Sequence, residues 1–296
     1  MLLAEGDEIM KTSRAVFLSL MLAAHGSVSA QQHSQSRPTT ISPRSAATLS
    51  ARVRALADAH SAAYFDQHPE SMTYYGIPGA RHDRLRDNSL VGVERWQAQE
   101  DASLAALRKI DHTRLAGRPE WVTYGTLRET LEASVAGRVC RTELWDVNQT
   151  AYGWPSWLAD LGRVQPIGTE ELRAQALARW RALPRFVDNE IGKLREGIRR
   201  GYTAPKGNVR LVIGQVDALL STSATESPFY GPASRDSTPS FQTELEAIVT
   251  ISINPALKRY RDFLEREYLP RARDVIGVSG RTSTTSRCFS SVMTAS

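Results

Sequence analysis

The histidines come first, because histidine is the commonest protein ligand of zinc and the commonest general base. The sequence contains six of them. None belongs to a His-Glu-x-x-His zinc motif, and no two lie four residues apart, as ligands on one helix face would. The motifs of serine hydrolases, P-loops and dinucleotide-binding proteins are also missing from the sequence. The sequence therefore predicts no catalytic residue, no metal ligand and no cofactor site in this chain.

Two segments carry side chains that suit a ligand. Residues 145–157 contain three tryptophans and a tyrosine, which predict an aromatic loop able to stack on a sugar or a peptide. Residues 201–210 follow a helix end and combine an aromatic residue with two cations. Core packing and a solvated connection are the respective alternatives. The candidate substrate-binding residues are Trp154, Trp157, Tyr202, Lys206 and Arg210.

A third segment, RHDRLRDNS at residues 81–89, concentrates charge before a helix start. Asp87, Asn88 and Ser89 are residue types that cap helices, which is the simplest interpretation of the segment. His82 and Asp83 leave a further role open. His60 lies on an apolar helix face, where a core histidine is favoured over a ligand.

Apolar residues at steps of three and four predict the helices that position these segments. The expected inward stripes are Leu49, Val53, Leu56, His60 and Tyr64; Val93, Trp96, Leu104 and Leu107; Trp121, Tyr124, Leu127, Leu131, Val135 and Val139; Leu172, Ala176, Trp180 and Leu183; Phe186, Ile191, Leu194 and Ile198; Val209, Val212, Val216 and Leu219; Phe241, Leu245 and Ile248; Leu257, Tyr260, Leu264 and Tyr268. We expect Pro184 to interrupt one helix, Pro255 to kink or break another and Gly201 to cap a third. No segment alternates as a strand does, so the predicted fold class is all-α, a multi-helix array.

The first 30 residues fit a secretory signal peptide. Lys11 and Arg14 precede the apolar run 15–24, and Val-Ser-Ala at residues 28–30 suits a signal peptidase. Acidic residues at positions 5, 7 and 8 do not suit such a signal, so Met10 is the expected start of translation. A Ser/Thr/Pro linker (31–44) then leads to the helical region, 45–278. We expect a periplasmic or secreted protein without an integral membrane span, because no apolar run approaches the length of one.

The last residues, 279–296, differ from the rest, because they are rich in Ser and Thr and contain no acidic residue. A natural tail and a shift of reading frame are the two explanations. Cys288 falls in this tail and Cys140 in a helical pattern, so a disulfide between them is not expected. The isoelectric point near 9.3 is no evidence for nucleic acid, because the basic residues are scattered among acidic ones. An anionic envelope fits the mild positive charge equally well.

Several segments in order resemble one family. They are HPESMTYYGIPGARHDRLRDNS, QPIGT, LREGIRRGYTAPKGNV, SPFYGPASRDSTPSF and YRDFLEREYLPRAR. Together, over residues 45–278, they resemble the N-terminal half of the bacterial DUF885 family. The resemblance implies an exported or lipid-anchored helical protein, and hence the N-terminal part of a larger α-helical, metallopeptidase-like fold.

The same resemblance implies a C-terminal half with a His-Glu-x-x-Pro-Gly-His motif similar to that of zinc-dependent peptidases. In such a site two histidines hold the metal while the glutamate activates water. No position of this sequence matches the motif, so no family ligand is transferred and zinc is expected only in a full-length member. Because the family continues past residue 278 with helical sequence, the resemblance favours a truncated or frameshifted end.

Two functions follow as hypotheses. The first is the substrate-cleft-forming N-terminal half of a zinc-dependent peptidase or hydrolase, inactive alone, whose full-length form takes a small peptide-like substrate. The alternative is a non-catalytic periplasmic helical module that binds or scaffolds peptides or cell-wall polymer. Whether the chain is an enzyme, and whether it forms oligomers, stays open at this point. A peptidase assay with zinc, with and without the catalytic half, separates the two hypotheses.

Overall fold

The computed structural model describes residues 43–274, with side chains from Ala47 onward. The predicted signal peptide (1–30), nearly all of the linker (31–44) and the Ser/Thr-rich tail (279–296) lie outside the described residues. Between residues 43 and 274 the chain forms helices and no strand, apart from an isolated bridge between Pro205 and Arg273. This confirms the predicted all-α class. None of the helices in this range has the length and apolar character needed to cross a bilayer.

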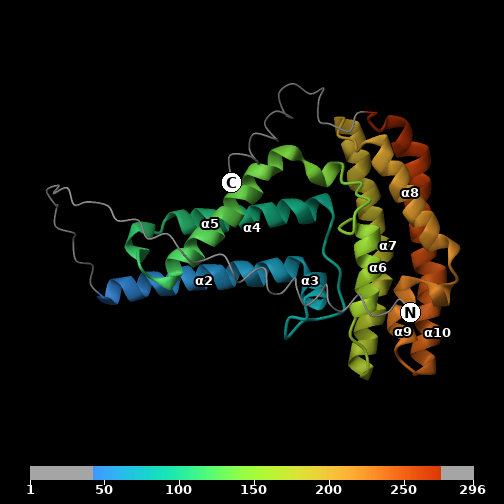
Figure 1. Ribbon diagram of the computed structural model, residues 1–296, viewed down its shortest axis with the longest axis horizontal. Coiled ribbons are helices and arrows are strands. Elements are labelled where there is room, and N and C mark those ends of the chain that lie inside the picture. Colours follow the sequence, from blue (N-terminus) through green and yellow to red (C-terminus); the bar gives the residue numbers. More distant parts are fainter. Residues whose placement is uncertain (1–42, 275–296) are drawn as a thin grey trace, which may run out of the picture. The chain divides into compact units, whose positions relative to one another are not determined.

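Three long helices form what we call the N-terminal bundle: α2 (Pro43–Gln67), α4 (Leu90–Arg108) and α5 (Pro119–Gly137). They lie side by side in Figure 1, and the short helix η2 (His112–Leu115) links α4 to α5. Their core consists of eight buried apolar residues, which are Val53, Leu104, Leu107, Ile110, Leu115, Tyr124, Leu127 and Leu131. Most of them belong to the predicted stripes, so three- and four-residue spacing located this core correctly.

Two residues of these stripes behave differently. Trp121, expected on the inner face of α5, is 54% exposed. Glu100 interrupts the stripe of α4 and is buried, where it accepts hydrogen bonds from Ser134 (2.6 Å) and Arg138 (3.0 Å). A buried carboxylate needs such partners, so Glu100 joins α4 to the end of α5 by charge and not by apolar contact.

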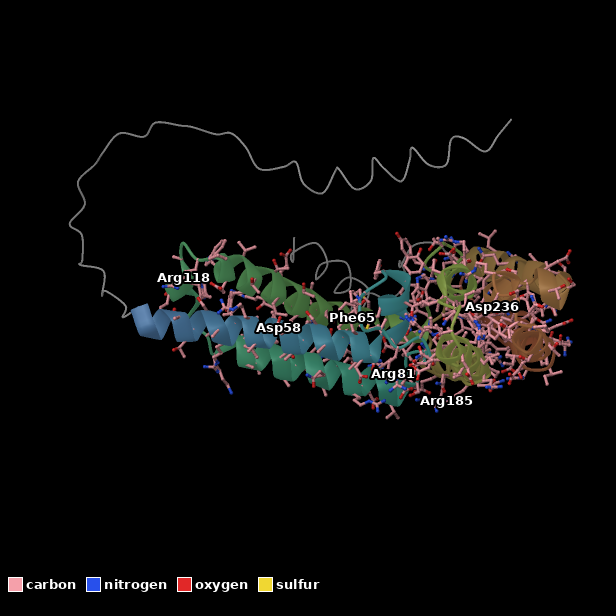
Figure 2. All side chains as sticks on the ribbon, turned by 90° about the horizontal axis from the view of Figure 1, so that it is seen from below. Asp58, Phe65, Arg81, Arg118, Arg185 and Asp236 are labelled. Atoms are coloured by element: carbon pink, nitrogen blue, oxygen red, sulfur yellow. The ribbon has the colours of Figure 1, made fainter. Side chains whose placement is uncertain are left out.

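The C-terminal bundle contains α6 (Trp154–Val164), α7 (Glu170–Arg200), α8 (Lys206–Ser221), α9 (Gly231–Ser234), α10 (Pro239–Ile248) and α11 (Asn254–Phe263). Helix α7 packs against α10 and α11, and α8 packs against α11. Figure 2 shows side chains filling the space between these helices. The core of this bundle holds 32 buried apolar residues, among them the fully buried Trp180.

Neither Pro184 nor Pro255 breaks a helix, which corrects the predicted interruption at Pro184 and the predicted break at Pro255. Pro184 does not interrupt a helix, because α7 runs unbroken for 31 residues with Pro184 inside it. The core on both sides of Pro184 fixes the helix firmly enough to tolerate one missing hydrogen bond. Pro255 causes no break either: it lies in the first turn of α11, which continues from α10 through the π-helical turn η7 (Val249–Ile253). A second π turn, η8 (Leu264–Tyr268), follows α11.

Two caps match their predictions. The hydroxyl of Ser89 accepts a hydrogen bond from the Gly92 amide at the start of α4 (3.1 Å). Gly201 adopts a left-handed conformation (φ 73°) directly after α7, as a C-terminal cap requires. Cys140 corrects another expectation: it lies in the short helix η3 (Arg138–Cys140) and is disulfide-bonded. The other cysteine of the sequence lies outside the described residues.

Candidate ligand-binding pocket

A buried arginine on α7 fastens the irregular segment that follows α3 (Pro69–Tyr74). The guanidinium of Arg179 is fully buried and donates to the carbonyl of Arg84 (2.9 Å), to Gln165 (2.6 Å) and to the hydroxyl of Thr73 (2.9 Å). Burial lowers the pKa of Arg179 to about 10, against the opposing charges of Glu70 and Asp83, so it remains protonated at neutral pH. This one side chain therefore holds α3, the segment and the end of α6 together.

The far end of the same segment is fastened to α7 two turns further on. The side-chain amide of buried Asn88 donates to the carbonyl of Phe186 (2.9 Å) and to Glu190 (2.7 Å). Glu190 also accepts from Lys193 (2.7 Å), which compensates its buried charge. Residues 84–87 are thus fixed from both sides. Asn88, one of the predicted capping residues, serves this anchor, while Ser89 caps α4.

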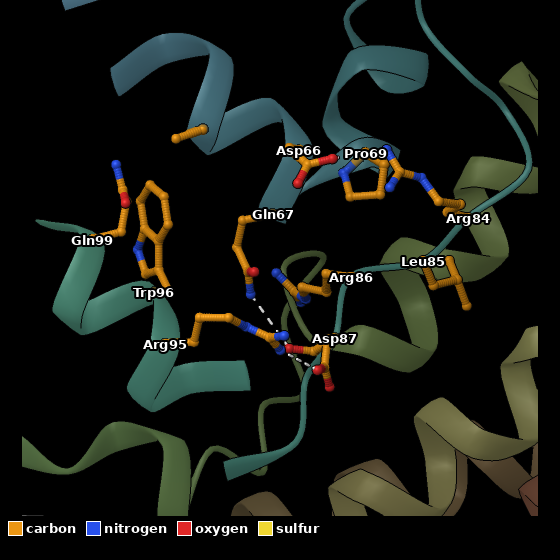
Figure 3. Close-up of a pocket in the computed structure, with 11 residues that line it drawn as sticks. Asp66, Gln67, Pro69, Arg84, Leu85, Arg86, Asp87, Arg95, Trp96 and Gln99 are labelled. Carbon is orange, nitrogen blue, oxygen red and sulfur yellow. Dashed lines mark hydrogen bonds and ion pairs between the residues drawn. The ribbon is translucent and has the colours of Figure 1, made fainter. Parts of the chain in front are cut away.

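Residues 84–87 form one wall of a cavity of about 450 Å³. The end of α2, the start of α3 and one face of α4 supply the other walls (Figure 3). The lining residues are Ala63, Asp66, Gln67, Pro69, Arg84, Leu85, Arg86, Asp87, Arg95, Trp96 and Gln99. Three arginines, two carboxylates and one tryptophan make this a polar pocket with a single large flat apolar wall.

The pocket arginines differ in how firmly they are held. Arg84 pairs with Asp66 (3.1 Å) and Arg95 with Asp87 (2.5 Å), and both guanidinium groups are about half exposed. Exposed ion pairs of this kind contribute about 0–1 kcal/mol, so an anionic ligand can replace the acidic partner. In Figure 3 the side chain of Gln67 points toward the Arg95–Asp87 pair, and its amide donates to the Asp87 carbonyl (3.3 Å).

Arg86 is the more deeply placed arginine of the pocket. Its Nε lies 3.4 Å from the carboxylate of Glu70, which is fully buried, and its backbone N–H donates to the same carboxylate (3.1 Å). Burial raises the pKa of Glu70, and the positive charges of Arg86 and Arg179 oppose that rise. Asp87 shows the opposite balance: burial alone would raise its pKa, but hydrogen bonds from Ser89 and Arg95 outweigh burial and lower it. Arg86 therefore has a lasting partner, whereas Arg84 and Arg95 can exchange theirs.

Trp96 is held in place by an aromatic cluster between α2 and α4. Its ring centroid lies 5.7 Å from that of His60, 5.9 Å from that of His68 and 6.1 Å from that of Tyr64. Burial, together with the charge of Arg86, lowers the pKa of His68 to about 4, so this imidazole is neutral at pH 7. Burial also lowers the pKa of His60. His60 packs against Trp96, as a core role requires, but it is only partly buried and its Nδ1 has no hydrogen-bond partner, so the prediction of a hydrogen-bonded core histidine needs correction.

The five sequence-predicted contact residues do not gather in one place. Trp154 begins α6 and is buried between the rings of Phe186 (5.8 Å) and Tyr260 (4.8 Å), so the expected aromatic loop ends at residue 153 and continues as a helix. Trp157 lies on the same helix, and its ring contacts the guanidinium of Arg86 at 5.8 Å. Among the five, it is the residue that touches a side chain lining the pocket of Figure 3.

Tyr202, Lys206 and Arg210 lie beyond the other end of α7. The Tyr202 amide donates to the Gly197 carbonyl (2.7 Å), eleven residues and about 16 Å along α7 from Phe186. Lys206 pairs with Asp274 (2.8 Å), and Arg210 is exposed on α8. Their part in substrate binding stays a prediction. The pocket itself was missed because three separate segments build it, although the segment RHDRLRDNS had marked one wall.

The pocket has groups that can bind a ligand but few that could catalyse a reaction. No serine, cysteine or histidine lines it, and both of its carboxylates are paired with arginine. Across residues 43–274, no group of three or more His, Cys, Asp or Glu side chains is placed to hold a metal ion. The described residues thus do not fit a zinc centre, and no catalytic step is assigned to them. Fold and site together define an all-α protein with a polar cavity of small-ligand size.

Comparison with known proteins shows the family to which the chain belongs. A family model described as "Bacterial protein of unknown function (DUF885)" matches residues 69–283, and the chain belongs to this family. Among solved structures, a protein from Colwellia psychrerythraea described as a "putative lipoprotein" shares the fold, with a TM-score of 0.64 at 18% identity. The match covers 76% of this chain but 42% of that one, so the chain spans less than half the length of this relative. No curated protein matches.

Proposed function

We propose that this chain is the substrate-binding helical part of an exported, peptidase-like hydrolase. It supplies groups that bind the substrate, while a segment other than residues 43–274 supplies the zinc ligands and the catalytic glutamate. Two facts support this proposal: the chain belongs to the DUF885 family, and it spans 42% of the Colwellia protein. The observation that carries it is the pocket of Figure 3, whose arginines, amides and tryptophan suit a peptide bearing a carboxylate.

Each part of such a peptide has a counterpart in the pocket. Arginine binds a carboxylate through paired N–H groups, and Arg84 and Arg95 present exposed guanidinium groups whose present partners are exchangeable. Gln67 and Gln99 carry amides that can both donate to and accept from a peptide bond. Trp96 offers a flat face for an apolar side chain. The ligand class is therefore a short peptide with a free carboxylate.

Calorimetry on the full chain tests the binding. The titrants are a tripeptide with a free C-terminal carboxylate and the same tripeptide with a C-terminal amide. We expect the first to bind at least tenfold more tightly, because a hydrogen bond to a charged group contributes about 1.5–3 kcal/mol. Arg95→Gln should remove that preference. Arg128→Gln, which breaks an exposed ion pair with Glu132 outside the pocket, should preserve it. Equal binding of the two tripeptides would refute the assigned ligand class.

An activity assay separates the hydrolase from a second function. The residues that line the pocket all lie within residues 63–99, and the contacts that hold its wall come from α7 of the same chain. This favours a free-standing binding module as the alternative. Peptidase activity with added zinc is measured on this chain alone and on the chain joined to the C-terminal half of a DUF885 protein. Activity that requires the joined protein and falls with Arg95→Gln supports the hydrolase. Tight binding without activity in the joined protein supports the module.

A further inference from the structure

The N-terminal bundle exposes two adjacent apolar side chains at one end. Trp121 and Val122 lie in the first turn of α5 and are 54% and 62% exposed. The helix buries Tyr124 and Leu131 on one side. Val122 lies on the opposite side, and Trp121 lies beside the buried stripe, one turn before Tyr124. Isolated apolar residues on a surface are common. An exposed tryptophan beside an exposed valine is less common, because their apolar surface stays in contact with water, and such pairs often mark an interaction site.

The same end of the bundle is basic. It is formed by the first half of α2, the first turn of α5 and η2, which are held together by the buried Val53 and Leu115. Residues 47–57 and 109–122 contain five basic side chains against two acidic ones, a net charge of +3. The basic residues are Arg52, Arg54, Lys109, Arg114 and Arg118. Figure 2 shows Arg118 at this end of the bundle. We call this surface, together with Trp121 and Val122, the basic tip.

Both acidic residues of the basic tip are engaged locally. Asp111 accepts hydrogen bonds from the backbone N–H (3.2 Å) and the hydroxyl (2.6 Å) of Thr113. Glu120 is 13% exposed and pairs with Arg54, whose own side chain is 56% exposed. The Arg54–Glu120 pair offsets one positive and one negative charge, and the net charge of the surface stays at +3.

We propose that the basic tip docks on an anionic phospholipid membrane. Tryptophan is enriched at the boundary between headgroups and acyl chains, and the adjacent valine adds an apolar side chain that can enter it. Arginine and lysine next to such a residue are attracted to anionic headgroups within about one Debye length. Charge complementarity and the exposed tryptophan both favour a lipid surface over a folded protein partner. The pocket of Figure 3 lies at the other end of α2, so docking leaves it accessible.

Vesicle flotation of the full chain tests the proposal. The probes are vesicles of equal parts phosphatidylglycerol and phosphatidylcholine, and vesicles of phosphatidylcholine alone, at low salt and at 0.5 M salt as a screening condition. We expect binding to the anionic vesicles at low salt, with at least tenfold weaker binding to the neutral ones or at high salt. Binding that ignores lipid charge and salt would overturn the proposal.

Variants of the same full chain locate the contact, so any contribution of the apolar run 15–24 is common to all of them. The double change Trp121→Ser with Val122→Ser should weaken binding at least tenfold, and Arg118→Gln about fivefold, the effect expected for one basic residue near the surface. Ile251→Ser removes an even more exposed apolar side chain from the C-terminal bundle and should change nothing.

A tip variant that binds as well as the wild type would refute the assignment, as would an equal loss with Ile251→Ser. Circular dichroism checks that each variant is folded; Arg118→Gln, which alters no apolar residue, keeps the test decisive if the double variant misfolds. A duplex oligonucleotide serves as a competitor. Binding of the oligonucleotide that depends on Trp121 while anionic vesicles do not bind would assign the basic tip to nucleic acid instead.

Discussion

The two bundles differ most in how much apolar surface each one buries. The C-terminal bundle has a core of 32 buried apolar residues, whereas the N-terminal bundle has eight for three long helices. Because burial of apolar area is the main favourable contribution to folding, the N-terminal bundle is the less stable of the two. Its long helices therefore depend on their attachment to α7, and the pocket lies close to that attachment.

The attachment to α7 is polar, whereas the cores of the two bundles are apolar. Arg179 holds one end of the segment 81–89, and Asn88 with Glu190 holds the other. Burying such groups costs desolvation, which hydrogen bonds offset only when every group finds its partners. A network of this kind fixes geometry more than it adds stability. The C-terminal core therefore contributes most of the stability, and the polar attachment positions the pocket.

The largest effect is expected when the buried guanidinium of Arg179 is removed, which tests whether the polar attachment positions the pocket. Arg179→Met should lower the free energy of unfolding by about 3–5 kcal/mol, because it removes the donor to the Gln165 side chain and to the Arg84 carbonyl, and one of the two positive charges near the buried Glu70. Urea denaturation measures the loss, and hydrogen exchange should show it first in residues 81–88. Arg185→Met, at an exposed position on the same helix, is the control. A loss below 1 kcal/mol would show that the segment is held by other contacts.

Matched truncations in the two cores come next. Leu107 and Leu183 are both fully buried, one in each bundle, and replacing either with alanine should cost about 2–5 kcal/mol. Leu107→Ala should accelerate hydrogen exchange in α2, α4 and α5 while α7 and α8 stay protected, because the smaller core has less stability to lose. If exchange rises equally in both bundles, they unfold as one cooperative body and the comparison fails.

Acid should weaken the N-terminal bundle selectively. The pKa of His68 is about 4 in the folded chain and near 6.5 when exposed, so the unfolded chain binds the extra proton between these values. Stability is therefore complete above pH 6.5 and falls toward pH 4, by about 1 kcal/mol per pH unit, slightly less than the full linkage slope. His68→Asn should flatten this dependence in thermal melts. His112→Asn should leave it intact, and an unchanged slope in the first variant would contradict the buried, neutral imidazole.

Sequence periodicity predicted the helices because each of them buries a stripe at helical spacing. It failed where tertiary context decides. Pro184 looks like a helix breaker locally, but the packed residues around it in α7 outweigh the missing hydrogen bond. Residues 154–157 combine tryptophan with proline and look like a loop, yet they begin α6. The pocket could not be predicted because Arg84, Arg95 and Gln67 come from three segments that meet only after folding.

The two π turns beside α11 set the rotation of everything that follows them. Each turn contains one residue more than an α-helix needs, which is how a helix absorbs a single-residue insertion without breaking. Each extra residue also rotates everything after it by about 100° around the helix axis. Tyr268 ends the second π turn, and its hydroxyl accepts a hydrogen bond from the Ala204 amide (2.7 Å). Deleting one residue from either π turn should therefore turn Tyr268 away from Ala204 and open this end of the bundle.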